Sequence, residues 1–246
     1  MFGINTDSNT RIRRGRLAGS AIGILALLAA TPIAAAVSGS GFTVVPSSHD
    51  VQPEANPVSS NQLALARFNT GHRSEAVSQW QTQAERGDAA AQFTLAVLYN
   101  RGDGGVARDM IEAARWYRKA AEQGHVVAQY NLGILHATGT GVPRDAAAAI
   151  EWWRLAAMQG HAEAQFNLGL FYAEGTGISP NPAEAVKWWS MAAEQGLAAA
   201  QFNLGLMYMK GEGTDEDQEE ALRLWRLSAG QGFNQAISLL KALSLD

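Results

Sequence analysis

The sequence predicts an all-α protein in which two-helix repeats stack into a solenoid. A motif that begins Ala-Gln recurs at Ala91, Ala128, Ala164 and Ala200, at intervals of 37, 36 and 36 residues. Within each copy, apolar residues recur at the spacing of a helix rather than a strand. Glycines follow each helical segment, where a left-handed residue ends a helix.

The composition supports a folded protein and excludes several classes of function. Hydrophobic residues make up 47% of the 246 residues and charged residues 17%, which is enough apolar material for a core. There is no cysteine, so disulfides and thiolate metal sites are excluded. The formal net charge is -4, which argues against a nucleic-acid-binding protein because such proteins need a basic face.

Residues 1–36 are predicted to be a signal peptide or a membrane anchor. Four arginines precede an uncharged, apolar stretch at residues 17–37, which is the order of an export signal. Ala34 and Ala36 are small residues suited to cleavage before Val37. About 20 apolar residues can also span a bilayer, so an inner-membrane anchor is the alternative. Both alternatives place the repeats outside the cytoplasm, in the periplasm, and confine any membrane contact to this segment.

Residues 37–60 are predicted to be a disordered linker, because they contain three prolines and many serines. The repeat domain is predicted to span residues 61–246. It divides into a partial repeat at 61–90, full repeats at about 91–127, 128–163, 164–199 and 200–235, and a C-terminal capping helix at 236–246.

The second helix of each repeat begins with a recognisable cap. Asp109, Asn181 and Asp217 each precede a glutamate by three residues, which is the pattern of a capping box. Asp145 has Ala148 at that place, so only the capping oxygen remains there.

Three glycines lie in the middle of first helices, where Gly costs about 1 kcal/mol relative to Ala. Their repetition predicts a close approach of an aromatic side chain from the partner helix. These structural glycines are Gly133, Gly169 and Gly205. The tryptophans of the full repeats all fall in second helices, and we expect them to form core and inter-repeat packing. They are Trp116, Trp152, Trp153, Trp188, Trp189 and Trp225.

The pattern A-Q-F-N-L-G-x-x-Y-x-x-G-x-G, followed by A-x-x-W-W-x-x-A-A-x-x-G, resembles that of Sel1-like repeats, which are relatives of tetratricopeptide repeats. The resemblance covers about residues 61–246. It implies a right-handed superhelical solenoid whose first helices line a concave face. Members commonly act as adaptors for other proteins, some of them in the bacterial envelope. One exported subgroup depends on disulfides, which this cysteine-free chain lacks.

Four equivalent positions are the candidate partner-binding residues of the concave face: Thr94, Asn131, Asn167 and Asn203. An asparagine amide offers a donor and an acceptor, which suits the backbone of an extended peptide. The alternative is that each asparagine bonds a neighbouring loop of the solenoid. For Gln129, Gln165 and Gln201 we expect a structural role between repeats, because buried amides find partners.

His125 and His161 occupy the same turn of adjacent repeats. A histidine pair can bind a metal or respond to pH, but no third ligand recurs with them. We therefore interpret them as exposed loop residues. The chain also lacks nucleophile and phosphate-loop motifs, so we expect no catalytic residue, cofactor or metal.

The sequence favours a non-enzymatic scaffold or adaptor that binds a partner protein outside the cytoplasm, such as an envelope sensor or an assembly component. Its acidic body would suit a basic partner segment. The alternative is an envelope glycan- or peptidoglycan-binding protein, which would require tryptophans on the surface.

Overall fold

A computed structural model describes residues 60–243, and this part of the chain is helical throughout, without a strand. The predicted signal segment and all of the predicted linker except its last residue lie outside the described residues. The helices are α3 (Ser60–Asn69), α4 (Arg73–Glu85), α5 (Ala89–Arg101), α6 (Met110–Glu122), α7 (Val126–Thr138), α8 (Ala146–Met158), α9 (Ala162–Glu174), α10 (Pro182–Glu194), α11 (Ala198–Lys210), α12 (Gln218–Gly230) and α13 (Asn234–Ala242).

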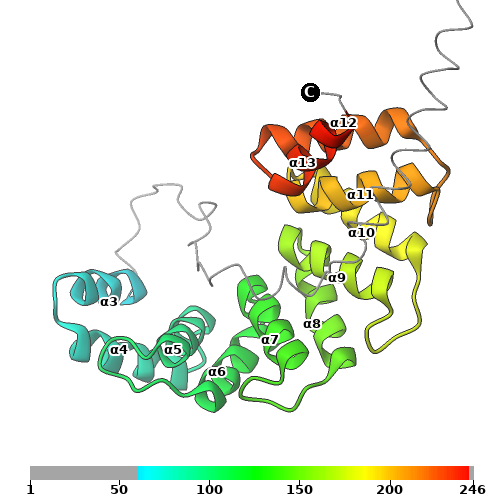
Figure 1. Ribbon diagram of the computed structural model, residues 1–246. Coiled ribbons are helices and arrows are strands. Elements are labelled where there is room, and N and C mark those ends of the chain that lie inside the picture. The colour runs from blue at the N-terminus through cyan, green and yellow to red at the C-terminus, as the bar shows by residue number, and fades with distance from the viewer. Residues whose placement is uncertain (1–59, 244–246) are drawn as a thin grey trace, which may run out of the picture.

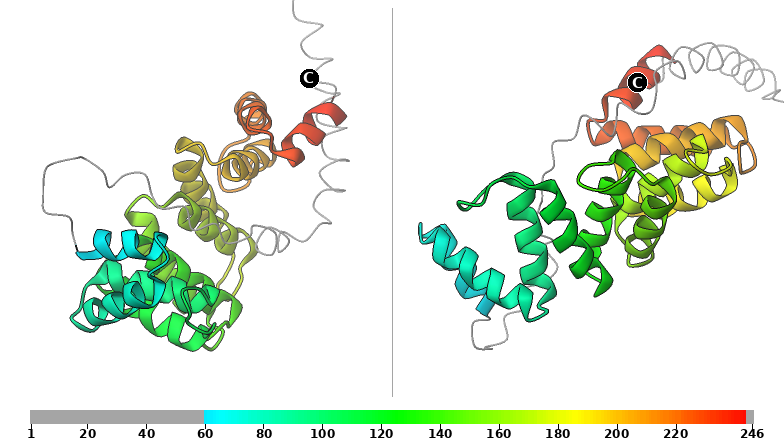
Figure 2. Two further views of the ribbon diagram at one scale, coloured as in Figure 1. Left: turned by 90° about the vertical axis from the view of Figure 1, so that its left-hand side faces the viewer. Right: turned by 90° about the horizontal axis from the view of Figure 1, so that it is seen from below.

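The helices form five antiparallel pairs, from α3–α4 to α11–α12, and α13 covers the last pair. Figure 1 shows that the pairs follow an arc in which the odd-numbered helices lie toward the inside and the even-numbered helices toward the outside. The turned views in Figure 2 show that the arc also twists. The predicted all-α solenoid of stacked two-helix repeats is thereby confirmed.

Helix ends follow the expected glycine and cap chemistry. The first helix α9 ends at Gly175, which has a φ of +71°, and the second helix α10 is followed by Gly196, with a φ of +89°. The side chain of Asp109 accepts hydrogen bonds from the backbone N–H groups of Ile111 and Glu112, at 2.9 and 3.1 Å. The three equivalent caps, Asp145, Asn181 and Asp217, accept one such bond each.

The glutamate half of the predicted capping box is wrong. The backbone N–H of Asp109 donates instead to the carbonyl oxygen of Tyr99, at 2.9 Å, in the preceding first helix. With that donor already satisfied, Glu112 turns to Arg115, and the two form an ion pair at 2.7 Å. The inter-helix loop therefore tethers the second helix to the first, a contact that local sequence spacing does not reveal.

The core runs the length of the solenoid, because each first helix packs on the second helix of its own pair and on that of the preceding pair. Leu95, Leu132 and Leu168, at equivalent positions, are fully buried between these neighbours. Burial of this kind stabilises a repeat only in the company of adjacent repeats. Within residues 60–243, no helix is both long and apolar enough to cross a membrane.

Candidate functional site

Each glycine of the first helices lies directly beneath a tryptophan of its own pair. A Cβ placed on Gly133 would lie 2.5 Å from the indole Nε1 of Trp153, and Gly205 stands in the same relation to Trp225. The indole Nε1 of Trp153 also donates to the carbonyl oxygen of Tyr130, at 3.1 Å. The same junction recurs in every full repeat except the first, where Ala96 replaces the glycine and Tyr117 the tryptophan.

Buried glutamines join three consecutive helices at each repeat. The side-chain Nε2 of Gln165 in α9 donates to the carbonyl oxygen of Ala157 in α8, at 3.0 Å. Its Oε1 accepts from the Nε2 of Gln195, at the end of α10, at 2.8 Å. Gln92, Gln129 and Gln201 make the equivalent pairs of bonds. These contacts are of the structural, inter-repeat kind predicted for the glutamines.

The four candidate partner-binding residues differ in exposure. Thr94, Asn167 and Asn203 are half-buried, whereas Asn131 is 5% exposed. The Nδ2 of Asn131 is buried without a hydrogen-bond partner, and the hydroxyl of Thr94 donates to the carbonyl oxygen of Ala90. Each position lies about 100° around its helix from the fully buried leucine that follows it, so the four residues sit at the flank of the inner helices.

A row of apolar side chains occupies the inner side of the same helices. Ile134 lies about 200° around α7 from the fully buried Leu132 and is only partly buried against the core. Val97 and Leu206, at the equivalent positions of α5 and α11, are half-buried like Ile134, while Leu170 of α9 is buried. The inner face therefore carries apolar side chains beside the amide positions.

A hollow opens at the N-terminal end of this face, between α3 and α5. Its lining combines the polar side chains of Asn61, Gln62 and Thr94 with the apolar Leu65 and Trp80. Leu65 is 52% exposed, while Trp80 is almost fully buried and donates through Nε1 to the Oδ1 of Asn61, at 2.7 Å. Thr94 is the candidate residue that lines this hollow.

The histidines of the first turns are helix caps, and their interpretation as exposed loop residues is wrong. The Nδ1 of His161 accepts from the backbone N–H of Ala164 at 3.3 Å, and its ring stacks on Tyr130 with the centroids 4.5 Å apart. His125 caps α7 in the same way and stacks on Phe93. A first-turn histidine looks like a loop residue in sequence because imidazole is a rare N-cap.

Glu163, Tyr130 and Asn167 meet at the seam between α7 and α9. The pKa of Tyr130 is raised to about 12, mainly by burial and then by the charge of Glu163, while a hydrogen bond to Asn167 acts in the opposite direction. The Oε2 of Glu163 lies 3.2 Å from the Nδ1 of His161. Burial lowers the pKa of His161, against the opposing effect of Glu163. At neutral pH this seam therefore holds a neutral imidazole and a neutral phenol beside the carboxylate side chain of Glu163.

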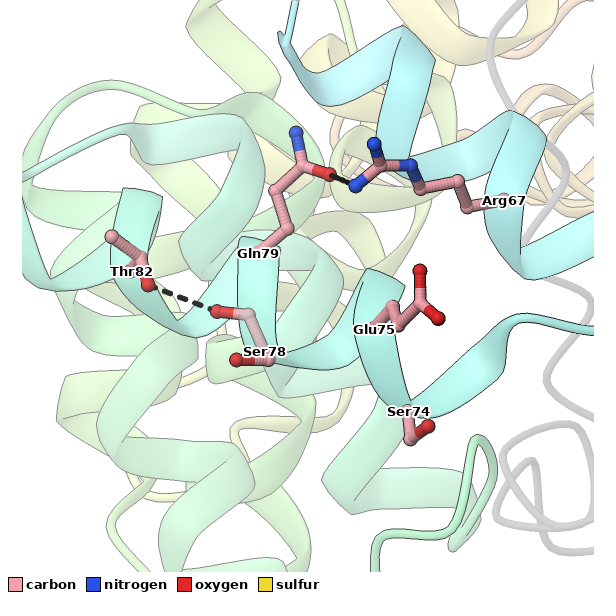
Figure 3. A pocket seen from close by; sticks show the side chains of 6 residues that line it. All are labelled: Arg67, Ser74, Glu75, Ser78, Gln79 and Thr82. Carbon is pink, nitrogen blue, oxygen red and sulfur yellow. Dashed lines mark hydrogen bonds between the residues drawn. The ribbon is translucent and has the colours of Figure 1, made fainter.

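The outer N-terminal end of the solenoid is polar. Figure 3 shows a shallow hollow there, lined by Arg67, Ser74, Glu75, Ser78, Gln79 and Thr82. Within it, Arg67 donates through Nη1 to the Oε1 of Gln79, at 3.2 Å. Gln79 stands where later repeats have Trp116, Trp152 and Trp188, which pack toward the preceding repeat. This surface is that of a terminal repeat, and we assign it no ligand.

Within residues 60–243, no group of three or more histidine, cysteine, aspartate or glutamate side chains is placed to hold a metal ion.

A family model for the Sel1 repeat matches four consecutive segments, residues 89–125, 126–161, 162–197 and 198–233. Together these segments make up more than half of the chain. The chain belongs to the Sel1 repeat family. Its repeat boundaries coincide with the helix pairs from α5–α6 to α11–α12. Sel1 repeats are in general protein-interaction modules, and proteins built from them are in general non-enzymatic scaffolds.

Two solved structures illustrate the likeness. A Sel1 repeat protein from Oxalobacter formigenes is 34% identical, with a TM-score of 0.63 over 72% of this chain and 71% of that one. The protein c5321, described as a protective antigen of uropathogenic Escherichia coli with an SLR fold, is 39% identical, with a TM-score of 0.62 over 65% of this chain. The match covers only 34% of c5321. The search of curated proteins returned no match.

Sequence reasoning missed the seam residue Glu163, because it does not recur. Val127 stands at its place in α7 and Ala199 in α11. Reasoning from positions that recur in every repeat does not find a residue such as Glu163, which occurs in one repeat alone.

Proposed function

We propose that this Sel1 repeat protein is a non-enzymatic scaffold whose inner face binds an extended segment of a partner protein. The observation that carries the proposal is the apolar row at Val97, Ile134 and Leu206, which runs beside the half-buried Asn167 and Asn203. At one end this face opens into the hollow lined by Leu65 and Thr94. Apolar contacts and amide groups side by side suit a peptide that presents both side chains and backbone.

The spacing of the repeats also suits an extended segment. Packed helices lie about 10 Å apart, and three residues of an extended chain span about 10 Å. Every third residue of the partner segment would then contact the apolar row. The backbone between these residues would pass the side-chain amides of Asn167 and Asn203. Asn131 is buried, so its amide would reach the segment only after a local rearrangement.

We further propose that the scaffold works outside the cytoplasm, in the periplasm or tethered to the inner membrane. The support is the arginine-rich, apolar and small-residue order of residues 1–37, which is typical of export signals. An envelope sensor or an assembly component is the class of partner that this location favours.

The tryptophans do not favour the glycan alternative. Sugar stacking needs an exposed aromatic face, but Trp80, Trp116, Trp153, Trp188, Trp189 and Trp225 are 6% exposed or less. Trp152 is half-buried and packs on the preceding repeats. We therefore do not propose a sugar-binding role.

Site-specific photocrosslinking in the native host tests the proposal. A photoreactive residue at Ile134 or Leu206 reports on the inner face, and one at the exposed Glu122 of α6 reports on the outer face. We expect the same protein to be captured from both inner positions and not from Glu122. Capture from Glu122 alone, or no capture from either inner position, would contradict the proposal.

A further inference from the structure

The seam between α7 and α9 carries the carboxylate of Glu163 at a position where α5, α7 and α11 have Ala90, Val127 and Ala199. Glu163 has a side chain that is 57% exposed and lies in the first turn of α9, two residues after the His161 cap. The ring of Tyr130 and the amide of Asn167 are its neighbours. Together they present a negative charge, an aromatic ring and an amide carbonyl in one corner.

We propose that this corner binds a lysine or arginine side chain of the partner, and that protonated His161 competes with that side chain for Glu163. The proposal rests on the inner-face function argued above. A cation gains from charge-assisted hydrogen bonds to a carboxylate and from a bond to an amide oxygen, and the corner offers both beside the Tyr130 ring. The acidic character of the chain as a whole attracts such a partner segment.

The competition follows from the geometry of His161. Its Nδ1 accepts from the N–H of Ala164 and lies 3.2 Å from the Oε2 of Glu163. A protonated Nδ1 cannot accept, so it would leave the helix N–H and donate to Glu163 instead. The groups that face the imidazole are Glu163 from α9, the phenol of Tyr130 from α7 and, at its backbone, the carbonyl oxygen of Ala156 from α8.

This competition determines whether the affinity for a cationic side chain rises or falls with pH. Burial keeps His161 neutral at neutral pH, which leaves Glu163 free to pair with a cation of the partner. Because burial lowers the pKa of His161, its protonation begins to neutralise the corner only as the pH falls below the ordinary histidine value of about 6.5. Binding of a cationic side chain is therefore strongest above that pH and weakens below it, by reciprocal linkage.

The adjacent repeat provides a matched control within the same molecule. His125 caps α7 through the same Nδ1 contact and stacks on Phe93, but Val127 stands where α9 has Glu163. The proposed competition depends on Glu163, and the side chain of Val127 cannot take its part. Changing His125 should therefore leave the pH dependence intact, whereas changing His161 should remove it.

The test is an NMR titration of the whole chain after residue 36 with a short peptide, acetyl-Ala-Arg-Ala-amide. The same peptide with citrulline, an uncharged isostere of arginine, is the comparison. For a partly exposed ion pair we expect binding at pH 7.5 to be about two- to fivefold tighter for arginine than for citrulline. The shift changes should centre on Glu163 and Asn167. The preference should disappear in Glu163→Gln and persist in Glu174→Gln, a carboxylate change at the other end of α9.

The pH arm uses the same probe at pH 5.5. In the wild type, we expect the ratio of arginine-peptide to citrulline-peptide affinity to fall toward one. The ratio should stay high in His161→Leu, which copies the Leu197 cap of α11. In His125→Leu it should fall as in the wild type. Equal binding of both peptides at pH 7.5, or shift changes away from the α7–α9 seam, would overturn the cation site. A pH dependence that survives His161→Leu would overturn the competition. Crosslinking at Ile134 and Leu206 tests the inner-face function without reference to this corner, so the two can fail separately.

Discussion

The indole ring of Trp189 lies so close to Gly169 that a side chain on the glycine would overlap it, and its Nε1 donates to the carbonyl oxygen of Phe166 at 3.1 Å. One tryptophan thus holds the two helices of a repeat together through both packing and a hydrogen bond. In α13, the last helix of the described residues, Lys241 takes the glycine position and is exposed. The glycine is needed only where a tryptophan covers it.

Replacing Gly169 with alanine should destabilise the protein. Overpacking typically costs about 1–3 kcal/mol, which exceeds the gain of about 1 kcal/mol from the better helix former. Gly230→Ala is the matched control, because Gly230 is also helical and has no atom within 4 Å of an added Cβ. Chemical denaturation should show a lower free energy of unfolding for Gly169→Ala and an unchanged or higher one for Gly230→Ala. Equal values would contradict the close-approach argument.

The adjacent tryptophans of α8 should differ sharply in their effect on stability. Trp153 is 3% exposed and covers Gly133, so Trp153→Ala should lower the free energy of unfolding by about 3–5 kcal/mol. Trp152 is half-buried, and Trp152→Ala should cost clearly less. A loss under about 1 kcal/mol for Trp153→Ala, by the same measurement, would show that the core site is not filled as described.

The Gln165–Gln195 pair should show energetic coupling. Gln165→Leu removes the bonds to Ala157 and Gln195, which should cost about 1 kcal/mol per bond. The carbonyl oxygen of Ala157 still accepts from the N–H of Gly160, and the Nε2 of Gln195 still donates to the carbonyl oxygen of Met191. A double-mutant cycle with Gln195→Ala isolates the bond between the two side chains. Gln235→Ala, at an exposed position of α13, should change stability little. If the effects of Gln165→Leu and Gln195→Ala on the free energy of unfolding were strictly additive, the hydrogen bond between the two side chains would not connect the helices energetically.

Asn131→Leu should stabilise the protein while weakening partner binding. The unpaired, buried Nδ2 costs about 1–3 kcal/mol, and Leu239 at the equivalent position of α13 shows that leucine fits this site in a helix of the same fold. A higher melting temperature together with less crosslinking from Ile134 would support a binding role. A lower melting temperature would show that the amide contributes to the fold instead.

Stability should fall on mild acidification, and His136 should account for part of the loss. Burial, followed by the charge of Arg118, lowers the pKa of the His136 imidazole. The unfolded chain then binds more protons below an unfolded pKa of about 6.5, so stability present at pH 7.5 is lost as the pH falls through that value. His136→Tyr should reduce the difference in unfolding free energy between pH 7.5 and 5.5. The hydroxyl of Tyr172, which accepts from Arg154 at 2.8 Å, shows how the tyrosine can be accommodated beside an arginine. An unchanged difference would place the titrating group elsewhere.

The fold was predictable because its determinants repeat. The Ala-Gln motif, the mid-helix glycines and the tryptophans recur in register, and the solenoid follows from them. The cap oxygen of Asp109 was also predictable from local spacing, but its bond to Tyr99 was not, because that contact depends on how the loop returns. The same holds for the site. The inner helices could be inferred, whereas the burial of Asn131 and the corner around Glu163 depend on how neighbouring repeats pack.

The most direct test of the inner-face account is the affinity of the captured partner segment for matched variants, measured by isothermal titration calorimetry. Asn167→Ala combined with Asn203→Ala removes two amide contacts, each worth about 1 kcal/mol, so the account predicts a loss of about tenfold or more. Ile111→Ala, at a 70% exposed position on the outer face, should bind like the wild type. Wild-type affinity in the double variant, with both proteins equally folded, would contradict the account.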